Sequence, residues 1–219
     1  MSRTAKTILM TSVLALGLSA QTSAEEMRVV DAKGFDAISI DGLIDLNISQ
    51  GKSFKVELEG TEKAVERVRT HVRDGQLTVE NGGENIQLNN FSDLDDYSVT
   101  VHITMPDLKS LEVDGLSDVV IKDMKLSDVR IEVDGKADVD MTGSCNSAEY
   151  KLDGMAKVMA KKFKCKDVEV SLDGIGSARV YASASVDAQV DGLAKITVYG
   201  EPKKRQVRED GFGDVSFID

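Results

Sequence analysis

Apolar and polar residues alternate along most of this chain, and in its second half the alternation returns with a nearly fixed period. Between Leu111 and Asp219 it flanks six Asp-Gly pairs, whose aspartates are 20, 19, 20, 18 and 19 residues apart. Period-two alternation is typical of half-buried strands, and a period near 19 residues is typical of a repeat architecture. The pattern predicts that each unit forms one coil and stacks on the next.

The apolar residues of each unit occupy the same positions relative to its aspartate. Aliphatic side chains predominate three and one residues before the aspartate, and five and seven residues after it. In a parallel solenoid, equivalent positions of successive coils lie above one another, so these four columns would form a continuous core. The sequence therefore predicts an all-β fold: a parallel, right-handed β-helix or solenoid with coils of about 19 residues.

Each Asp-Gly pair is expected to form the corner of a coil, because Gly adopts a positive φ without a Cβ clash and Asp can accept hydrogen bonds from turn amides. DGLIDLNI (41–48) has the same form as DGLSDVVI (114–121), so the repeat begins early, is interrupted, and resumes over repeat coils 107–219. The predicted structural corners are Gly42, Gly115, Gly135, Gly154, Gly174, Gly192 and Gly211.

The interruption has helical spacing. Thr61 has the side chain of an N-cap, and apolar residues follow it at Ala64, Val65, Val68 and Val72. This predicts one short helix near 62–72, with His71 as a solvated helix residue. Asp74-Gly75 predicts an ordinary turn after it. His102 alternates with Val101 and Ile103 and is expected on the opposite, surface side of its strand.

The first residues have the layout of an export signal. Arg3 and Lys6 precede an apolar run from Ile8 to Leu18, and small residues end at Ala24. This pattern predicts a secretory signal peptide over 1–24, since the run is too short to span a bilayer. We therefore expect a single mature domain, residues 25–219, without a transmembrane span. Its expected location is periplasmic or at the cell surface, outside the cytoplasm.

Charge and composition restrict the partners. The net charge is −11, and it becomes −13 when the two cations of the signal are removed. Such a chain is poorly suited to bind nucleic acid or anionic lipid through bulk charge. Trp is absent and aromatic residues make up 5% of the chain, which gives little support to a sugar-binding surface of stacked rings.

The repeat aspartates have two interpretations. Carboxylates about 4.8 Å apart along one edge would repel one another and could form a ladder of cation sites, because hard cations take oxygen ligands. Alternatively, each aspartate satisfies its own turn while water and salt screen the repulsion, which is the interpretation we favour. The candidate ladder comprises Asp114, Asp134, Asp153, Asp173, Asp191 and Asp210. No cofactor is predicted.

Cys145 and Cys165 lie one repeat apart, each eight residues before a repeat aspartate. Stacked coils would bring their Cα atoms near the window of about 4.4–6.8 Å that a disulfide requires, and an exported compartment permits oxidation. Two free thiols packed as small core residues are the alternative. Zinc is not expected, because two cysteines and two distant histidines have no ligand spacing.

Motifs for catalysis are missing from the sequence. It has no nucleophile elbow, P-loop or dinucleotide fingerprint, and its acidic residues are spread over every coil without a selected pair. No catalytic residue is therefore predicted.

Two stretches resemble the head GIN domain family of exported bacterial proteins, which are labelled auto-transporter adhesins. The first is FDAISIDGLIDLNISQGKSFKVELEG (35–60), with the following helix and RDGQLTVENG (73–82). The second is VDAQVDGLAKITVYGEPKKRQVREDGFGDVSFID (186–219), and the resemblance covers nearly all of 29–219. It implies a β-helix-like fold and an envelope or surface location, and it brings no catalytic residues.

The expected function is that of an exported, non-enzymatic β-solenoid, an adhesin-like binding or structural module of the envelope that presents a long acidic face. The alternative is a glycan-active enzyme or lectin of the bacterial envelope. The expected partner is an unknown envelope component or a second copy docked through the solenoid ends. Self-association is expected at the C-terminal coil, which Phe212, Phe217 and Ile218 would leave apolar.

Overall fold

The computed structural model describes residues 25–82 and 97–218, and these form strands with one short helix. The expected signal peptide, residues 1–24, lies outside the described residues. The elements in chain order are β1 (Glu25–Val30), β2 (Ala37–Gln50), β3 (Lys55–Thr61), α1 (Glu62–Arg67), β4 (Arg69–Arg73), β5 (Gln76–Asn81), β6 (Val99–Met105), β7 (Ser110–Lys125), β8 (Asp128–Tyr199), β9 (Lys204–Gly211) and β10 (Asp214–Ile218).

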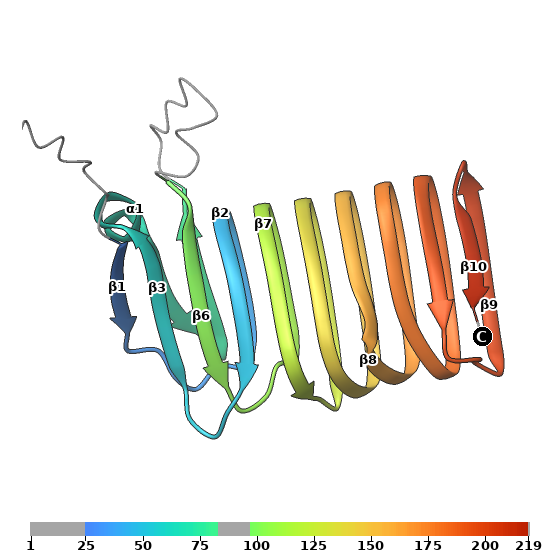
Figure 1. Ribbon diagram of the computed structural model, residues 1–219, viewed down its shortest axis with the longest axis horizontal. Coiled ribbons are helices and arrows are strands. Elements are labelled where there is room, and N and C mark those ends of the chain that lie inside the picture. Colours follow the sequence, from blue (N-terminus) through green and yellow to red (C-terminus); the bar gives the residue numbers. More distant parts are fainter. Residues whose placement is uncertain (1–24, 83–96, 219) are drawn as a thin grey trace, which may run out of the picture.

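The Asp-Gly repeat sets the strand register. β2 pairs in parallel with β7, and β7 with the start of β8, so that Asp41, Asp114 and Asp134 lie opposite one another. At the other end, β8 pairs in parallel with β9 and β10, with Asp191 opposite Asp210. Figure 1 shows the ribbon from β7 to β10 as successive windings that lie side by side along the long axis of the molecule.

The N-terminal part departs from the predicted parallel pairing, and the sheet is mixed. β3 pairs antiparallel with β1 and β6, and β4 pairs antiparallel with β5, whereas β5 and β6 pair in parallel with β2. Asp74 and Gly75 both have positive φ, 51° and 82°. Such angles suit the tight two-residue turn of a hairpin, which sends β5 back along β4.

The helix is shorter than the predicted 62–72. Thr61 is its N-cap, as expected, and the Thr61 Oγ1 accepts a hydrogen bond from the Ala64 amide at 3.2 Å. The helix ends at Arg67, and the next residues extend as β4 because the hairpin turn gives them β5 as a partner. His71 therefore lies on a strand, exposed, and not on a helix.

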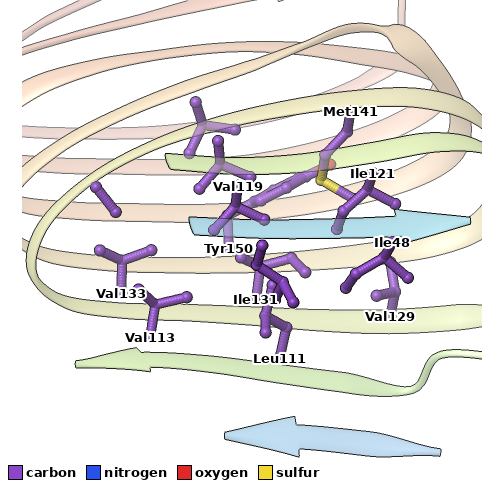
Figure 2. Packing of buried hydrophobic residues seen from close by; sticks show 14 of the residues in the cluster. Ile48, Leu111, Val113, Val119, Ile121, Val129, Ile131, Val133, Met141 and Tyr150 are labelled. Atoms are coloured by element: carbon purple, nitrogen blue, oxygen red, sulfur yellow. The ribbon is translucent and has the colours of Figure 1, made fainter. Parts of the chain in front are cut away.

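The core runs through the inside of the windings. Figure 2 shows side chains of several coils pointing toward one another, among them Leu111, Ile131, Val119 and Tyr150. The column three residues before the aspartates is at most 1% exposed in five coils: Leu111, Ile131, Tyr150, Val170 and Ala188. In the last coil Val207 is exposed, and Val215 and Phe217 are only partly buried against the core. The predicted inner columns are thus confirmed, except at the final coil, where no other described coil covers the outer side.

β1, α1 and β4 complete the N-terminal end. The Arg28 Nη2 donates a hydrogen bond to the Val68 carbonyl at 3.0 Å, which ties β1 to the end of α1. Ala64 and Val65 of α1 are fully buried. No helix in the described part of the chain has the length and apolar character needed to cross a bilayer.

Candidate functional site

The Asp-Gly corner forms a straight edge along the stacked coils. All seven predicted corner glycines have a positive φ, from 75° at Gly211 to 129° at Gly135. At Gly154 (φ 100°), an added Cβ would lie 2.5 Å from the carbonyl oxygen of Gly135 in the preceding coil. Glycine is therefore required there for two reasons, backbone conformation and the close approach of two coils.

The six repeat aspartates lie exposed along this edge. Only Asp210 accepts a hydrogen bond from the following glycine amide (2.9 Å) among the residues described. The expected role as acceptor of turn amides thus appears only in the last coil. In the inner coils the corner backbone lies within the inter-coil ladder, where neighbouring strands supply the hydrogen-bond partners.

A shallow groove of about 640 Å³ lies beside the aspartates over the first coils. We call it the acidic trough, because eight carboxylates and a single cation, Lys151, line it. The acidic residues are Asp41, Glu80, Glu112, Asp114, Glu132, Asp134, Asp153 and Asp173. The trough therefore presents a strongly negative surface to any ligand.

The aspartates are not arranged as a metal cluster. Within 25–82 and 97–218, no group of three His, Cys, Asp or Glu side chains is placed to hold a metal ion. Carboxylates in a straight row do not converge on one point, whereas a calcium ion takes six to eight oxygen ligands. The arrangement suits a long ligand better than a single ion.

Large apolar side chains follow the aspartates at a distance of two residues. Their exposed fractions rise toward the C-terminus, to 58% at Leu193 and 87% at Phe212. We call this row the apolar ridge, and its exposed members are Leu116, Met155, Ile175, Leu193 and Phe212. Packing does not explain these residues, because they point away from the core that the same coils bury.

The sequence reasoning missed the apolar ridge, although a signal was present. The column two residues after the aspartate reads Leu43, Leu116, Lys136, Met155, Ile175, Leu193 and Phe212. It is apolar in six of seven coils, at positions adjacent to the corner glycine. This column therefore places apolar side chains at a charged corner, where the structure leaves them exposed.

The flank beyond the ridge carries mixed charge. The Asp118 amide donates to the Asp45 Oδ1 at 3.0 Å, and burial, followed by the charges of Asp45 and Asp138, raises the pKa of Asp118. Further along, Lys157 lies 3.5 Å from Asp138. Lysine therefore offsets part of the repulsion on this flank, which it does not do in the aspartate row.

Some carboxylates away from the corner are paired. The Arg130 guanidinium contacts Glu132 and Glu149 at 2.5 Å each, and its hydrogen bond lowers the pKa of Glu132. By contrast, none of the six repeat aspartates forms an ion pair with a cation in the described ranges. Unneutralised carboxylates thus follow the whole length of the apolar ridge.

The two histidines do not assemble a catalytic site with these residues. His102 faces away from the core on β6, and its Nε2 lies 2.6 Å from the Glu59 Oε2. His71 lies on β4. Neither residue lines the acidic trough.

The three residues expected to make the C-terminal coil apolar lie in different environments. Phe212 belongs to the apolar ridge, and Ile218 is 45% exposed on β10. The Phe217 ring is partly buried and is covered by the Arg205 guanidinium, 4.3 Å from the ring centroid. The end of the molecule is therefore less apolar than the sequence suggests.

Cys145 and Cys165 form a disulfide between adjacent coils, with Cα atoms 4.5 Å apart. Both side chains are buried. The link closes a loop with a sequence separation of 20 residues.

Replacing both Cys145 and Cys165 by serine should lower the free energy of unfolding by about 2–4 kcal/mol, because the open loop gains conformational freedom in the unfolded chain. Denaturant unfolding of the variant and of the parent protein measures the difference. Reductant should destabilise the parent by a similar amount and leave the variant unchanged. An equal effect of reductant on both proteins would contradict the assignment.

Comparison with known proteins supports the fold. A crystal structure described as a "putative adhesin" from Bacteroides fragilis NCTC 9343 is 21% identical, with a TM-score of 0.66 over 90% of this chain and 98% of that chain. A structure described as a "putative lipid binding protein" from Parabacteroides distasonis ATCC 8503 is 15% identical, with a TM-score of 0.52 over 90% of this chain and 98% of that chain. At these identities the likeness shows the fold alone. A comparison with curated protein sequences found no match.

The family comparison covers most of the chain. The model of one family matches residues 34–202, which include β2 to β8 and five of the six coil corners after residue 110. That family is described by adhesion and not by an enzymatic activity. The chain therefore belongs to the family described as "Putative auto-transporter adhesin, head GIN domain".

Proposed function

We propose that the protein is an exported, non-enzymatic, parallel and right-handed β-solenoid that acts as an adhesin-like binding module of the bacterial envelope. The in-register parallel strands and the right-handed preference of parallel crossovers support the solenoid. The family description and the Cys145–Cys165 disulfide support export to an oxidising compartment, periplasmic or at the cell surface. The partner is an envelope component.

The apolar ridge is the observation that carries this proposal. Contiguous exposed apolar surface on a soluble protein marks sites of interaction with other molecules. Here the side chains lie in one row on a rigid edge, so a partner can cover several of them at once without ordering a loop. Burying one large aliphatic side chain contributes about 1.5–3 kcal/mol. Because association itself costs at least about 4 kcal/mol in lost freedom, a partner must cover several members of the ridge together.

A second copy of the chain is a less favourable partner at the solenoid ends. β9, at the C-terminal end, carries Lys204, Arg205, Arg208, Glu209 and Asp210. Charged side chains on an edge strand oppose its pairing with another chain.

The test compares ridge variants with a matched apolar variant elsewhere. The double substitution Ile175→Ser and Leu193→Ser should weaken binding to immobilised bacterial envelope by about tenfold or more, since about 1.4 kcal/mol corresponds to a factor of ten. Val29→Ser is the control, because Val29 is also exposed (68%) but lies on β1, away from the ridge. Equal binding by the parent protein, the double ridge variant and the Val29→Ser variant would overturn the proposal.

A further inference from the structure

The aspartate row and the apolar ridge lie side by side on the same corner, which specifies the chemistry of the partner. We infer that the corner binds a cationic amphipathic α-helix of a partner protein, laid along the axis of the stacked coils. The apolar side chains of that helix lie on the ridge, and its Lys and Arg side chains lie over the aspartates. This inference rests on the proposed binding function of the ridge.

Charge complementarity supports a cationic partner. In four successive coils an exposed apolar residue comes two positions after an exposed aspartate, as in Asp173 with Ile175 and Asp191 with Leu193. These aspartates have no cation partner in 25–82 and 97–218, whereas Asp187 pairs with Arg208 at 3.0 Å. A partner that covers the ridge must therefore neutralise the adjacent carboxylates, because burying an unpaired charge is costly.

The same charge argues against an anionic partner at this surface. A membrane rich in anionic lipid, or a nucleic acid, would place negative groups against the aspartate row and the acidic trough. Like charges in apposition across an interface cost several kcal/mol. A basic polypeptide segment satisfies both the charge and the apolar side chains.

The spacing of the ridge selects a helix over an extended strand. Adjacent coils are 4.5 Å apart where Cys145 meets Cys165, close to the usual strand separation of about 4.8 Å. A helix returns a side chain to the same face about every 5.4 Å, whereas a strand does so about every 6.8 Å. From Met155 to Phe212, three coil intervals, a helix therefore drifts from register by about 2 Å and a strand by about 6 Å.

The experiment uses a synthetic helical peptide of about four turns, with Leu at one position per turn and Lys on both sides of the Leu stripe. Its affinity for the purified protein, with the disulfide intact, is measured by fluorescence anisotropy at two salt concentrations. Circular dichroism records whether the peptide becomes helical on binding. The comparison peptides have the same composition in scrambled order, or Glu in place of every Lys.

The expected result is binding of the Lys peptide, weaker at higher salt, with increased helicity, and no binding of either comparison peptide. Asp173→Asn with Asp191→Asn should weaken binding by about 2- to 30-fold, since exposed charge pairs each contribute about 0.2–1 kcal/mol. Asp140→Asn is the control, because Asp140 is exposed but lies four positions beyond the ridge column. It should leave the affinity unchanged.

Three outcomes would overturn the inference: binding of the Glu peptide as tight as that of the Lys peptide, an unchanged affinity of the double Asp variant, or bound peptide without added helicity. Failure here is distinguishable from failure of the proposed function. If the serine variants of the ridge lose envelope binding but the Lys peptide does not bind, the ridge is a docking surface for a different partner and this inference is wrong.

Discussion

Replacing Gly154 by alanine should lower the free energy of unfolding by about 2–5 kcal/mol. This range adds the cost of a non-glycine residue at positive φ to the cost of overpacking two coils. The residue has φ 100°, and its new Cβ would lie 2.5 Å from the Gly135 carbonyl oxygen. That atom belongs to the backbone, so relief requires the two coils to separate. Separation in turn weakens the ladder on both sides of the corner.

Gly34→Ala is the matched control for this substitution. Gly34 also has a positive φ, 76°, but no atom lies within 4 Å of an added Cβ. Its cost should be limited to the conformational penalty of about 1–2 kcal/mol. Denaturant unfolding of the two variants separates the contributions, and an equal loss in both would show that the approach of the coils at Gly154 is not limiting.

Replacing Tyr150 by alanine should lower the free energy of unfolding by about 3–5 kcal/mol, the range for removing a large aromatic side chain from a core. Tyr150 is 1% exposed and is the only aromatic residue in an inner column that is otherwise aliphatic. A cavity in a narrow core cannot close without moving neighbouring coils, whose positions the ladder holds. Thermal or denaturant unfolding measures the loss.

Tyr181→Ala serves as the comparison, because the Tyr181 ring is only partly buried and contacts the Lys164 Nζ 3.6 Å from its centroid. Its removal should cost about 0.5–1 kcal/mol, as expected for an exposed cation–π contact. A similar loss in both variants would contradict the assignment of Tyr150 to the core.

The pH dependence of the protein's stability provides a second test of the burial of Tyr150. Burial raises the pKa of its phenol above the ordinary value. The folded state therefore holds this proton more strongly than the unfolded state, and stability falls as the pH rises above about 10, where the unfolded tyrosine ionises. Tyr150→Phe should show a smaller alkaline loss of stability than the parent protein.

The repeat made the register of most of the fold predictable. The spacing of the Asp-Gly pairs placed Asp41 opposite Asp114 and Asp114 opposite Asp134, as the strands show. Thr61 was correctly assigned as an N-cap because its capping bond is local. Features that depend on a repeated or local pattern could thus be inferred from the sequence alone.

Features that depend on a single, non-repeated strand pairing could not be inferred from the sequence. β4 was expected to be helical because Val72 continues the helical spacing of Val65 and Val68, whereas the tight turn at Asp74-Gly75 gives it β5 as a partner. The antiparallel pairing of β1 and β3 likewise has no counterpart in the repeat that predicted a parallel sheet. In both places tertiary hydrogen bonding outweighed local preference.

Only part of the candidate site could be predicted from the sequence. The aspartates were identified from their spacing, but the apolar residues two positions later were not, because they fall outside the four columns whose alternation predicts the core. The exposure of Leu193 and Phe212 depends on how sharply the chain bends at Gly192 and Gly211, and the amino-acid sequence does not specify this bend.

The disulfide has a mechanical consequence for a protein that belongs to an adhesin family. A coil in such a stack is held only by its neighbours, so tension on the C-terminal end would detach coils one at a time. Detachment would advance from β10 toward Cys165, whose covalent link to Cys145 joins two adjacent coils in the middle of the stack. Tension that reaches Cys165 passes through the disulfide to Cys145, so the residues between the two cysteines are not pulled out as extended chain.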